Sequence, residues 1–263
     1  MAANAKPLIL FDSIFLATAD LTITASGTAA GYDVDNITDL RPYTWWQADA
    51  HGTKYITLEI AEAQAADSLG IIGHNLATAE ATVSLESSDT GAWGGEEEIQ
   101  VAGFTPADDK AFLKIFTSAS AAYWRLKIVT AAVAARLAVC VLGERLDFQR
   151  YPAGPFDPAP ETVNATSARS KAGHLIGSTL QNIGIEISAA WASLTPAWIE
   201  SDFRPAWDDH LSQLKPFFWA WDITNHATEV YFVAIPAGFS LSMPFDPYRR
   251  SLSLLMQGVK ESG

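Results

Sequence analysis

Short segments in the first half of the chain alternate between apolar and polar residues. In KYITLEI (54–60) every second residue is isoleucine or leucine, and ATVSLES (81–87) and YWRLKIV (123–129) repeat this alternation. The segment RLAVCVL (136–142) is apolar almost throughout. A period of two residues is typical of strands with one buried face, and a continuous apolar run is typical of a strand covered on both faces. The pattern therefore predicts an antiparallel β-sandwich.

The second half combines predicted strands with one helical region. Strand-like patterns occur in NIGIEIS (182–188), FFWAWDI (217–223), TEVYFVAI (228–235) and RRSLSLLMQGVKE (249–261). Between the first two of these, Thr195 followed by Pro196 predicts a helix start, with a capping hydroxyl and a proline at the first helical position. Pro205 is expected to end or kink this helix, and Pro216 to close the helical region. The pattern predicts sheet, then helix, then sheet.

A proline-rich segment separates the two patterns. RYPAGPFDPAPET (150–162) holds four prolines, which do not occur in central strands or in helix interiors. We interpret it as a stiff connector between two domains, residues 1–147 and residues 148–263.

Composition and charge narrow the classes of function. The 263 residues carry 30 acidic and 17 basic side chains, a net charge of −13, with no basic stripe, so nucleic acid is not an expected partner. No apolar run reaches the roughly 18–20 residues of a membrane span, and Pro7, Asp12 and Asp20 argue against a cleaved signal. The single cysteine, Cys140, is expected to be a buried apolar side chain.

Sequence motifs of catalysis and of cofactor binding are absent. The histidines are isolated, there is no HExxH, GxSxG or phosphate-binding loop, and no cofactor is predicted. Asp208 and Asp209 adjoin His210, but neighbours on a helix point in different directions, so a solvated face is the simpler interpretation. We therefore predict that the protein is not an enzyme. Two carboxylates across a cleft, as in a glycosidase, would be visible only in the tertiary structure.

Two loops carry candidate ligand-binding residues. Oxygen ligands for calcium are available from Asp33, Asp35 and Asp39, although turns and helix caps explain the same residues. Aromatic rings suit the apolar faces of pyranose sugars, and a buried or subunit-contacting tryptophan is the alternative. The candidate carbohydrate-binding residues are Trp45, Trp46, Asp49, His51 and Trp93.

The segment GIIGHNL (70–76) could be a ligand site or the end of a strand. Two isoleucines suit a core, and glycines relieve crowding of the backbone. We expect His74 and Asn75 to form hydrogen bonds with the following turn rather than to bind a ligand.

Large aromatic residues are concentrated in the second half. An exposed apolar patch of this kind usually marks an interface, whereas filling of the core is the competing explanation. The candidate interface residues are Trp207, Phe217, Phe218, Trp219 and Trp221.

Several segments, taken in order, resemble the discoidin-like (galactose-binding-like) domains of tailed-bacteriophage tail proteins. The similarity runs through DNITDLRPYTWWQA (35–48), YITLEI (55–60), ADSLGIIGHNL (66–76), VSLESSDTG (83–91) and AAYWRLKI (121–128). The second half, through GIEISAAW (184–191), KPFFWAWD (215–222) and SLSLLMQG (251–258), looks like the split-barrel-plus-helix modules of tail-tube and distal-tail proteins.

This resemblance implies a mainly β protein, with a discoidin-like jelly-roll sandwich followed by a split-barrel-like module with one helix. It implies a structural component of the tail tip or baseplate, part of a ring at the distal end of the tail. The implied partners are other tail proteins and further copies of the chain, and the implied location is the virion, after assembly in the host cytoplasm. The alternative is a carbohydrate-binding module that attaches to a host-surface glycan. The resemblance supplies no catalytic residue and no cofactor.

Overall fold

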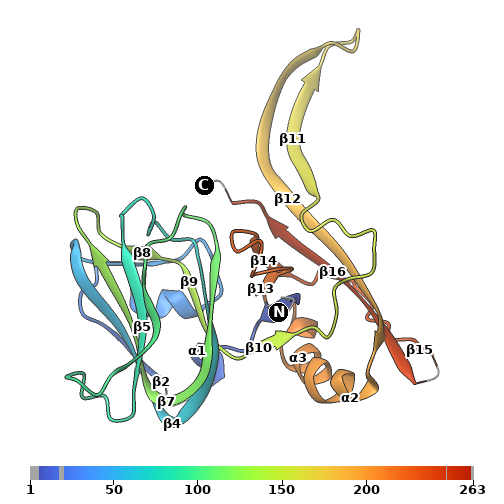
Figure 1. Ribbon diagram of the computed structural model, residues 1–263. Coiled ribbons are helices and arrows are strands. Elements are labelled where there is room, and N and C mark those ends of the chain that lie inside the picture. Colours follow the sequence, from blue (N-terminus) through green and yellow to red (C-terminus); the bar gives the residue numbers. More distant parts are fainter. Residues whose placement is uncertain (1–5, 18–20, 247, 262–263) are drawn as a thin grey trace.

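The structure is a computed structural model that describes residues 6–17, 21–246 and 248–261. A β-sandwich stands beside a second β module, and a two-stranded arm projects from the second module (Figure 1). All strand pairs are antiparallel. The predicted mainly β fold, with a sandwich in the first half and one helical region in the second, is confirmed. No helix among the described residues is long and apolar enough to span a membrane.

The sandwich is built around two long strands that bend. Its six-stranded sheet has the order β2-β4-β7-β5-β6, with β9 also paired to β4. Register shifts interrupt the pairing of β4 with β7 between Glu59 and Gln64, so each strand serves both layers. The strands are β2 (Leu21–Ala25), β4 (Gly52–Ile72), β5 (Thr82–Ser88), β6 (Glu98–Phe104), β7 (Phe112–Thr130) and β9 (Val139–Gly143). A small sheet joins β3 (Trp46–Gln47) to β8 (Arg136–Leu137), and short helices α1 (Ile14–Ala17) and η1 (Val34–Thr38) complete the module.

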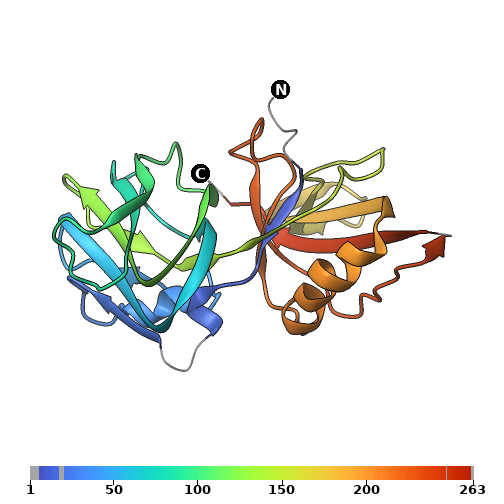
Figure 2. The same ribbon diagram turned by 60° about the horizontal axis from the view of Figure 1, so that its bottom comes forward.

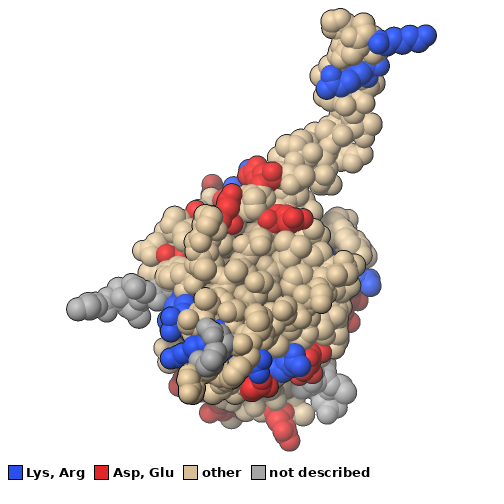
Figure 3. Space-filling model, turned by 90° about the vertical axis from the view of Figure 1, so that its right-hand side faces the viewer, with Lys and Arg blue, Asp and Glu red and all other residues tan. Residues whose placement is uncertain are grey.

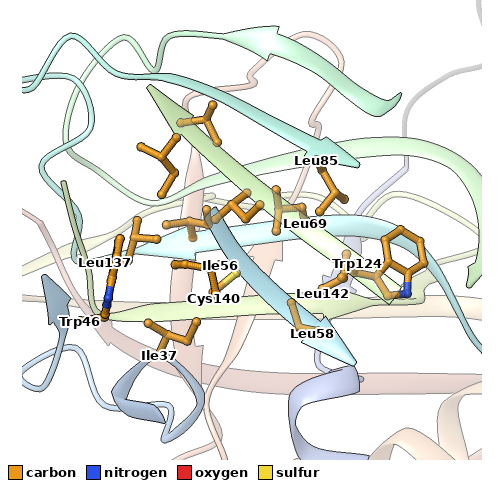
Figure 4. Close-up of a cluster of buried hydrophobic side chains, with 14 of the residues drawn as sticks. Ile37, Trp46, Ile56, Leu58, Leu69, Leu85, Trp124, Leu137, Cys140 and Leu142 are labelled. Carbon is orange, nitrogen blue, oxygen red and sulfur yellow. The ribbon is translucent and has the colours of Figure 1, made fainter. Parts of the chain in front are cut away.

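The core of the sandwich uses the alternation seen in the sequence. The apolar side chains of the KYITLEI segment are buried, and Trp124 and Cys140 lie with them between the layers (Figure 4). Burial raises the pKa of the Cys140 thiol to about 12, which leaves the thiol protonated and unreactive at neutral pH.

The second module is one sheet with a helical segment on one face (Figure 2). The strand order is β10-β1-β13-β14-β16-β12-β11, with β15 paired to β16. The strands are β1 (Leu8–Leu10), β10 (Arg145–Asp147), β11 (Glu161–Arg169), β12 (Leu175–Leu194), β13 (Phe217–Ala220), β14 (Val230–Ala234), β15 (Phe245–Asp246) and β16 (Arg249–Val259). This order is an open path, and the finer split-barrel description stays a prediction.

The helical segment begins where the sequence predicts. The side chain of Thr195 accepts a hydrogen bond from the amide of Trp198 and caps the first turn. The segment continues past Pro205, because a π-helical turn before it widens the hydrogen-bond pattern and Arg204 donates to Ile199. Its parts are α2 (Pro196–Trp198), η2 (Ile199–Phe203), α3 (Arg204–Asp209) and η3 (Leu211–Gln213).

The second sheet includes a strand from the start of the chain, and the two modules share a core. Strand β1, from the start of the chain, lies between β10 and β13 in the second sheet. Apolar side chains of β1 and β13 pack against Ile72, Leu113 and Val139 of the sandwich. The predicted domain boundary at residue 147 stays a prediction. It assigns β1 to the first domain, although β1 pairs within the sheet of the second module.

The proline-rich segment packs on the second module. The carbonyl of Arg150 accepts a hydrogen bond from the indole of Trp191, and the amide of Ala153 donates to the carbonyl of Ala190. Tyr151 donates to the Asp222 carboxylate. The segment is therefore held against the sheet rather than extended freely between two domains.

A candidate binding groove between the two modules

The predicted sugar platform does not form, because its residues point in different directions. Trp46 is fully buried in the core of the sandwich (Figure 4). Its indole nitrogen donates to the hydroxyl of Thr28. Assigning Trp46 to a ligand surface was therefore wrong. Trp45 immediately precedes β3, and successive side chains of extended chain point to opposite sides. Trp45 therefore packs against the core between the two modules.

The polar members of the predicted platform lie in the turn that precedes β4. Asp49 and His51 are exposed, and Asp49 forms an ion pair with Lys54. The hydrogen bond from Lys54 lowers the pKa of Asp49 below its usual value. Neither residue lines the groove described below.

Trp93 lies on a separate surface, the outer face of the sandwich sheet. The guanidinium carbon of Arg125 is 4.1 Å from the centre of the Trp93 ring and 4.6 Å from that of Tyr55. Arg125 also pairs with the buried carboxylate of Glu86. Trp93 therefore folds over a charged pair on the sheet and does not meet Trp45.

A groove of about 630 Å³ lies where the loop end of the sandwich meets strands β14 and β16. Its apolar lining includes Leu40, Ile72, Phe232, Val233 and Val259. Its polar and charged lining includes His74, Asp109, Arg136, Lys260 and Glu261. An apolar groove with a few convergent polar groups is the usual form of a small-ligand site.

Arg136 is a half-buried side chain in the wall of the groove. Its guanidinium carbon lies 5.2 Å from the centre of the Trp45 ring, and Trp45 in turn stacks on Tyr32 at 5.5 Å. Its Nε atom has no hydrogen-bond partner among the described residues. Because Nε is buried, only the stacking on Trp45, which holds the guanidinium in place in the wall of the groove, bears on ligand binding.

His74 is fixed in one neutral tautomer. Its Nε2 atom donates to the carbonyl of Lys110 at 2.8 Å, and its Nδ1 atom accepts from the amide of Leu76 at 3.2 Å. Burial lowers the pKa of His74. The Asp109 carboxylate lies 3.9 Å from Nδ1. Because Nδ1 already accepts the hydrogen bond from Leu76, it carries no proton, and His74 and Asp109 do not form an ion pair.

The residue that follows supports the same loop. The Asn75 amide donates to the carbonyl of Ala134 at 3.0 Å and accepts from the amide of Arg136 at 2.8 Å. The interpretation of GIIGHNL as a strand end is confirmed, and His74 accepts a hydrogen bond from Leu76 in the following turn, whereas the Asn75 side chain bonds the distant segment Ala134–Arg136 instead. His74 nevertheless contributes to the wall of the groove, which the sequence did not predict.

Two carboxylates of the groove have opposite pKa shifts. Burial opposes ionisation of Asp109, but hydrogen bonds from Thr78 and from the amide of Ala77 outweigh it and lower the pKa. Burial raises the pKa of Glu261, which accepts a hydrogen bond from the amide of Ala111 at 2.6 Å. Both carboxylates are therefore engaged with the protein, and they hold the loops that form the groove.

The predicted calcium ligands cap turns instead of converging. Asp33 accepts a hydrogen bond from the amide of Asp35 at the start of η1. Asp39 accepts from the amide of Arg41 at 2.8 Å and from the hydroxyl of Thr44 at 2.6 Å. The part of the chain that the structure describes contains no group of three metal-ligating side chains. The metal assignment of Asp33, Asp35 and Asp39 was therefore wrong.

The predicted interface aromatics lie mainly inside the protein. Phe217 and Trp219 face the helical segment, whereas Phe218 faces the sandwich. All three are fully buried, because the second sheet is covered on both faces, and their assignment to an interface was wrong. Trp207 and Trp221 are half-buried at the edge of the same core.

No catalytic arrangement forms around the predicted acidic pair. Asp208 and Asp209 are exposed, while the ring of His210 is buried and hydrogen-bonded to the carbonyl of Pro216 at 2.9 Å. Burial lowers the pKa of His210.

No known family model matches the sequence, and no curated protein is similar to it. Solved structures that the chain resembles include a chitosan-binding module of a Paenibacillus chitosanase/glucanase, with 20% identity, a TM-score of 0.40, and coverage of 47% of this chain and 94% of that one. A second is a Clostridium perfringens CBM32 module in complex with GalNAc-β-1,3-galactose, with 15% identity, a TM-score of 0.39 and coverage of 47% and 94%. A third is a pectin-binding module, with 22% identity, a TM-score of 0.39 and coverage of 46% and 88%. These similarities concern the fold of about half the chain, and no residue role is transferred from them.

Proposed function

We propose that this chain is a non-catalytic carbohydrate-binding protein and that its ligand lies in the groove between the two modules. The observation that carries the proposal is the lining of the groove. Apolar side chains such as Ile72 and Val259 offer a surface for the apolar face of a sugar ring. Arg136 and Lys260 offer donors for hydroxyl, acetamido or carboxylate oxygens at its rim.

The test compares the groove with the outer face of the sandwich sheet. A glycan array on the full chain identifies a ligand, and calorimetry then measures its affinity for the variants Arg136→Ala and Trp93→Ala. Loss of a charged hydrogen bond costs about 1.5–3 kcal/mol, so we expect Arg136→Ala to weaken binding about tenfold or more. Trp93→Ala is expected to bind like the wild type.

Thermal unfolding of both variants controls for a loss of structure, because Arg136 also stacks on Trp45. If Trp93→Ala loses binding and Arg136→Ala retains it, the ligand lies on the sheet face and the groove is the wrong site. Absence of any glycan bound at millimolar concentration contradicts the function itself.

A second candidate is a structural component of a bacteriophage tail tip or baseplate. The observation that favours it is the arm formed by β11 and β12, because a long exposed hairpin suits a protein that assembles with others. In this proposal the protein is built into the virion in the host cytoplasm, within a ring of tail proteins. Peptides of this chain in purified virions, and its density at the tail tip in electron micrographs, are the expected results. Their absence contradicts this candidate.

The proposed absence of catalysis is tested separately. We expect no turnover of ester, glycoside or peptide substrates by the purified chain. Turnover that is abolished by one point mutation in the groove would make the protein an enzyme.

A further inference from the structure

The arm is the most exposed part of the protein. Every residue from Glu161 to Asn182 is exposed except Ser170, and the ribbon rises away from both modules (Figure 1). Strand β11 pairs with β12 along this length, but the pairing of β12 with β16 extends outward only to Gly184. A two-stranded hairpin without a packed face is only marginally stable in water. A surface that covers one face of the arm would therefore stabilise it.

One face of the arm continues the core side of the second sheet. On β12, Ile187 and Ile185 are buried against the helical segment, and Ile183 follows them on the same side. Across the ribbon, Val163 pairs with Ile183, and after a bulge Ala165 pairs with Leu180. These two cross-strand pairs share one face, which we call the apolar face of the arm, and the next pair on this face, Ser167 with Ser178, is polar.

The apolar face of the arm is open to solvent. The exposed fractions of Val163 and Leu180 are 65% and 58%. The opposite face carries polar cross-strand pairs, such as Thr166 with Thr179 and Asn164 with Asn182. A strand pattern with one apolar and one polar side is typical of a ribbon whose apolar side is covered.

The charge of the arm differs in sign from that of the rest of the chain. Residues 162–182 contain Arg169 and Lys171 and no acidic residue, and these two side chains form a basic tip (Figure 3). Without them, the net charge of −13 for the whole chain becomes −15. Acidic side chains gather at the base of the arm (Figure 3), where Glu161 and Glu186 are exposed. A basic tip is thus electrostatically complementary to the body of another copy.

We infer that the apolar face of the arm, with its basic tip, binds a second copy of this chain. The arm has 22 residues, Glu161 to Asn182, and its apolar face is one side of this ribbon. The acidic body of a second copy attracts the tip, and its surface covers Val163 and Leu180. The inference deepens the assembly candidate above, on which it rests, and is independent of glycan binding.

The experiment measures self-association of the full chain by analytical ultracentrifugation over a range of concentrations and salt. Three double variants are compared with the wild type: Val163→Thr with Leu180→Thr on the apolar face, Arg169→Gln with Lys171→Gln at the tip, and Thr166→Ser with Thr179→Ser on the polar face. Circular dichroism and thermal unfolding establish that each variant keeps its fold. The fold of the body is expected to be unaffected, because the exposed arm makes few contacts with it.

We expect the wild type to self-associate. The apolar-face variant should associate at least about tenfold more weakly. The tip variant should also associate more weakly at low salt and show a smaller dependence on salt. The polar-face variant should match the wild type.

A wild type that stays monomeric at all concentrations overturns the inference, as does association unchanged in the apolar-face variant. The assembly candidate fails differently, by absence of the chain from virions, so the two failures are distinguishable.

Discussion

Strand β12 has an inner half that is packed and an outer half that is not. Between Ile185 and Trp191, alternate side chains are buried in the core of the second module. Between Leu175 and Asn182 every side chain is exposed, although the backbone pairs with β11 there, as the backbone of the inner half pairs with β16. Pairing of backbone groups exchanges hydrogen bonds with water for hydrogen bonds within the protein, with little net gain. Burial of apolar surface therefore distinguishes the half that supports the fold from the half that is free to bind.

The largest expected effect comes from the inner half. Trp191 stacks on Phe148 at 4.2 Å between ring centres, and it is fully buried. We expect Trp191→Ala to lower the free energy of unfolding by about 3–5 kcal/mol. Leu180→Ala, on the same strand but in the arm, should change it by less than about 0.5 kcal/mol. Urea unfolding of both variants measures the comparison, and similar losses would show that the outer half is part of the folded core.

Two glycines, one in the packed body and one in the arm, should differ in how well they tolerate an added methyl group. A Cβ atom at Gly70 would lie 2.7 Å from the Phe218 ring, where the modules meet, whereas a Cβ atom at Gly177 in the arm meets nothing within 4 Å. Overpacking a close contact costs about 1–3 kcal/mol, which we expect for Gly70→Ala. Gly177→Ala should be neutral or stabilising by up to about 1 kcal/mol. Chemical denaturation measures both, and a neutral Gly70→Ala would mean that the modules pack loosely.

The free energy of unfolding should depend on pH through two histidines that are buried in the packed regions. Burial lowers the pKa of His74 and of His210 from 6.5, so the unfolded chain binds more protons than the folded one below that pH. The stability contributed by the neutral rings is present above about pH 6.5 and is lost as pH falls towards the folded pKa values.

The measurement is the urea midpoint at pH 7.5 and at pH 5.5. We expect a lower midpoint at pH 5.5 and a smaller decrease in His74→Gln, whose amide can donate and accept like the neutral ring. An equal decrease in that variant would show that His74 does not contribute. The arm has no buried histidine, so its proteolysis should not follow this pH dependence.

The smallest effect on stability is expected from cutting the arm. Trypsin should cleave first after Arg169 or Lys171, because these residues are exposed and make few contacts with the body. The rest of the protein should unfold at an unchanged temperature. The proline-rich segment 150–162 is the competing site, because the sequence indicates a connector there, but its contacts with Trp191 and Asp222 protect it. Mass spectrometry of early fragments decides between the two sites.

Local patterns in the sequence determined the strands of the sandwich, the cap at Thr195 and the burial of Cys140. These features depend on periodicity and on neighbouring residues, which the sequence shows directly. The hydrogen bond between His74 and Leu76 is local in the same sense, whereas the bonds of His74 to Lys110 and of Asn75 to Ala134 and Arg136 depend on the tertiary fold.

Which aromatic side chains are buried depends on contacts between segments that are far apart in the sequence. Whether Trp46 or Trp45 faces the core depends on the direction of a two-residue strand, and a shift of one residue reverses it. Phe217, Phe218 and Trp219 are all buried because two modules cover opposite faces of one sheet, which no local pattern records. Arg136 and Glu261 line one groove although they are far apart in the sequence, because the groove forms where the two modules meet. The exposed half of β12 also carries large apolar side chains, Leu175, Ile176 and Leu180, so apolar character alone does not separate the arm from the core. Tertiary contacts do.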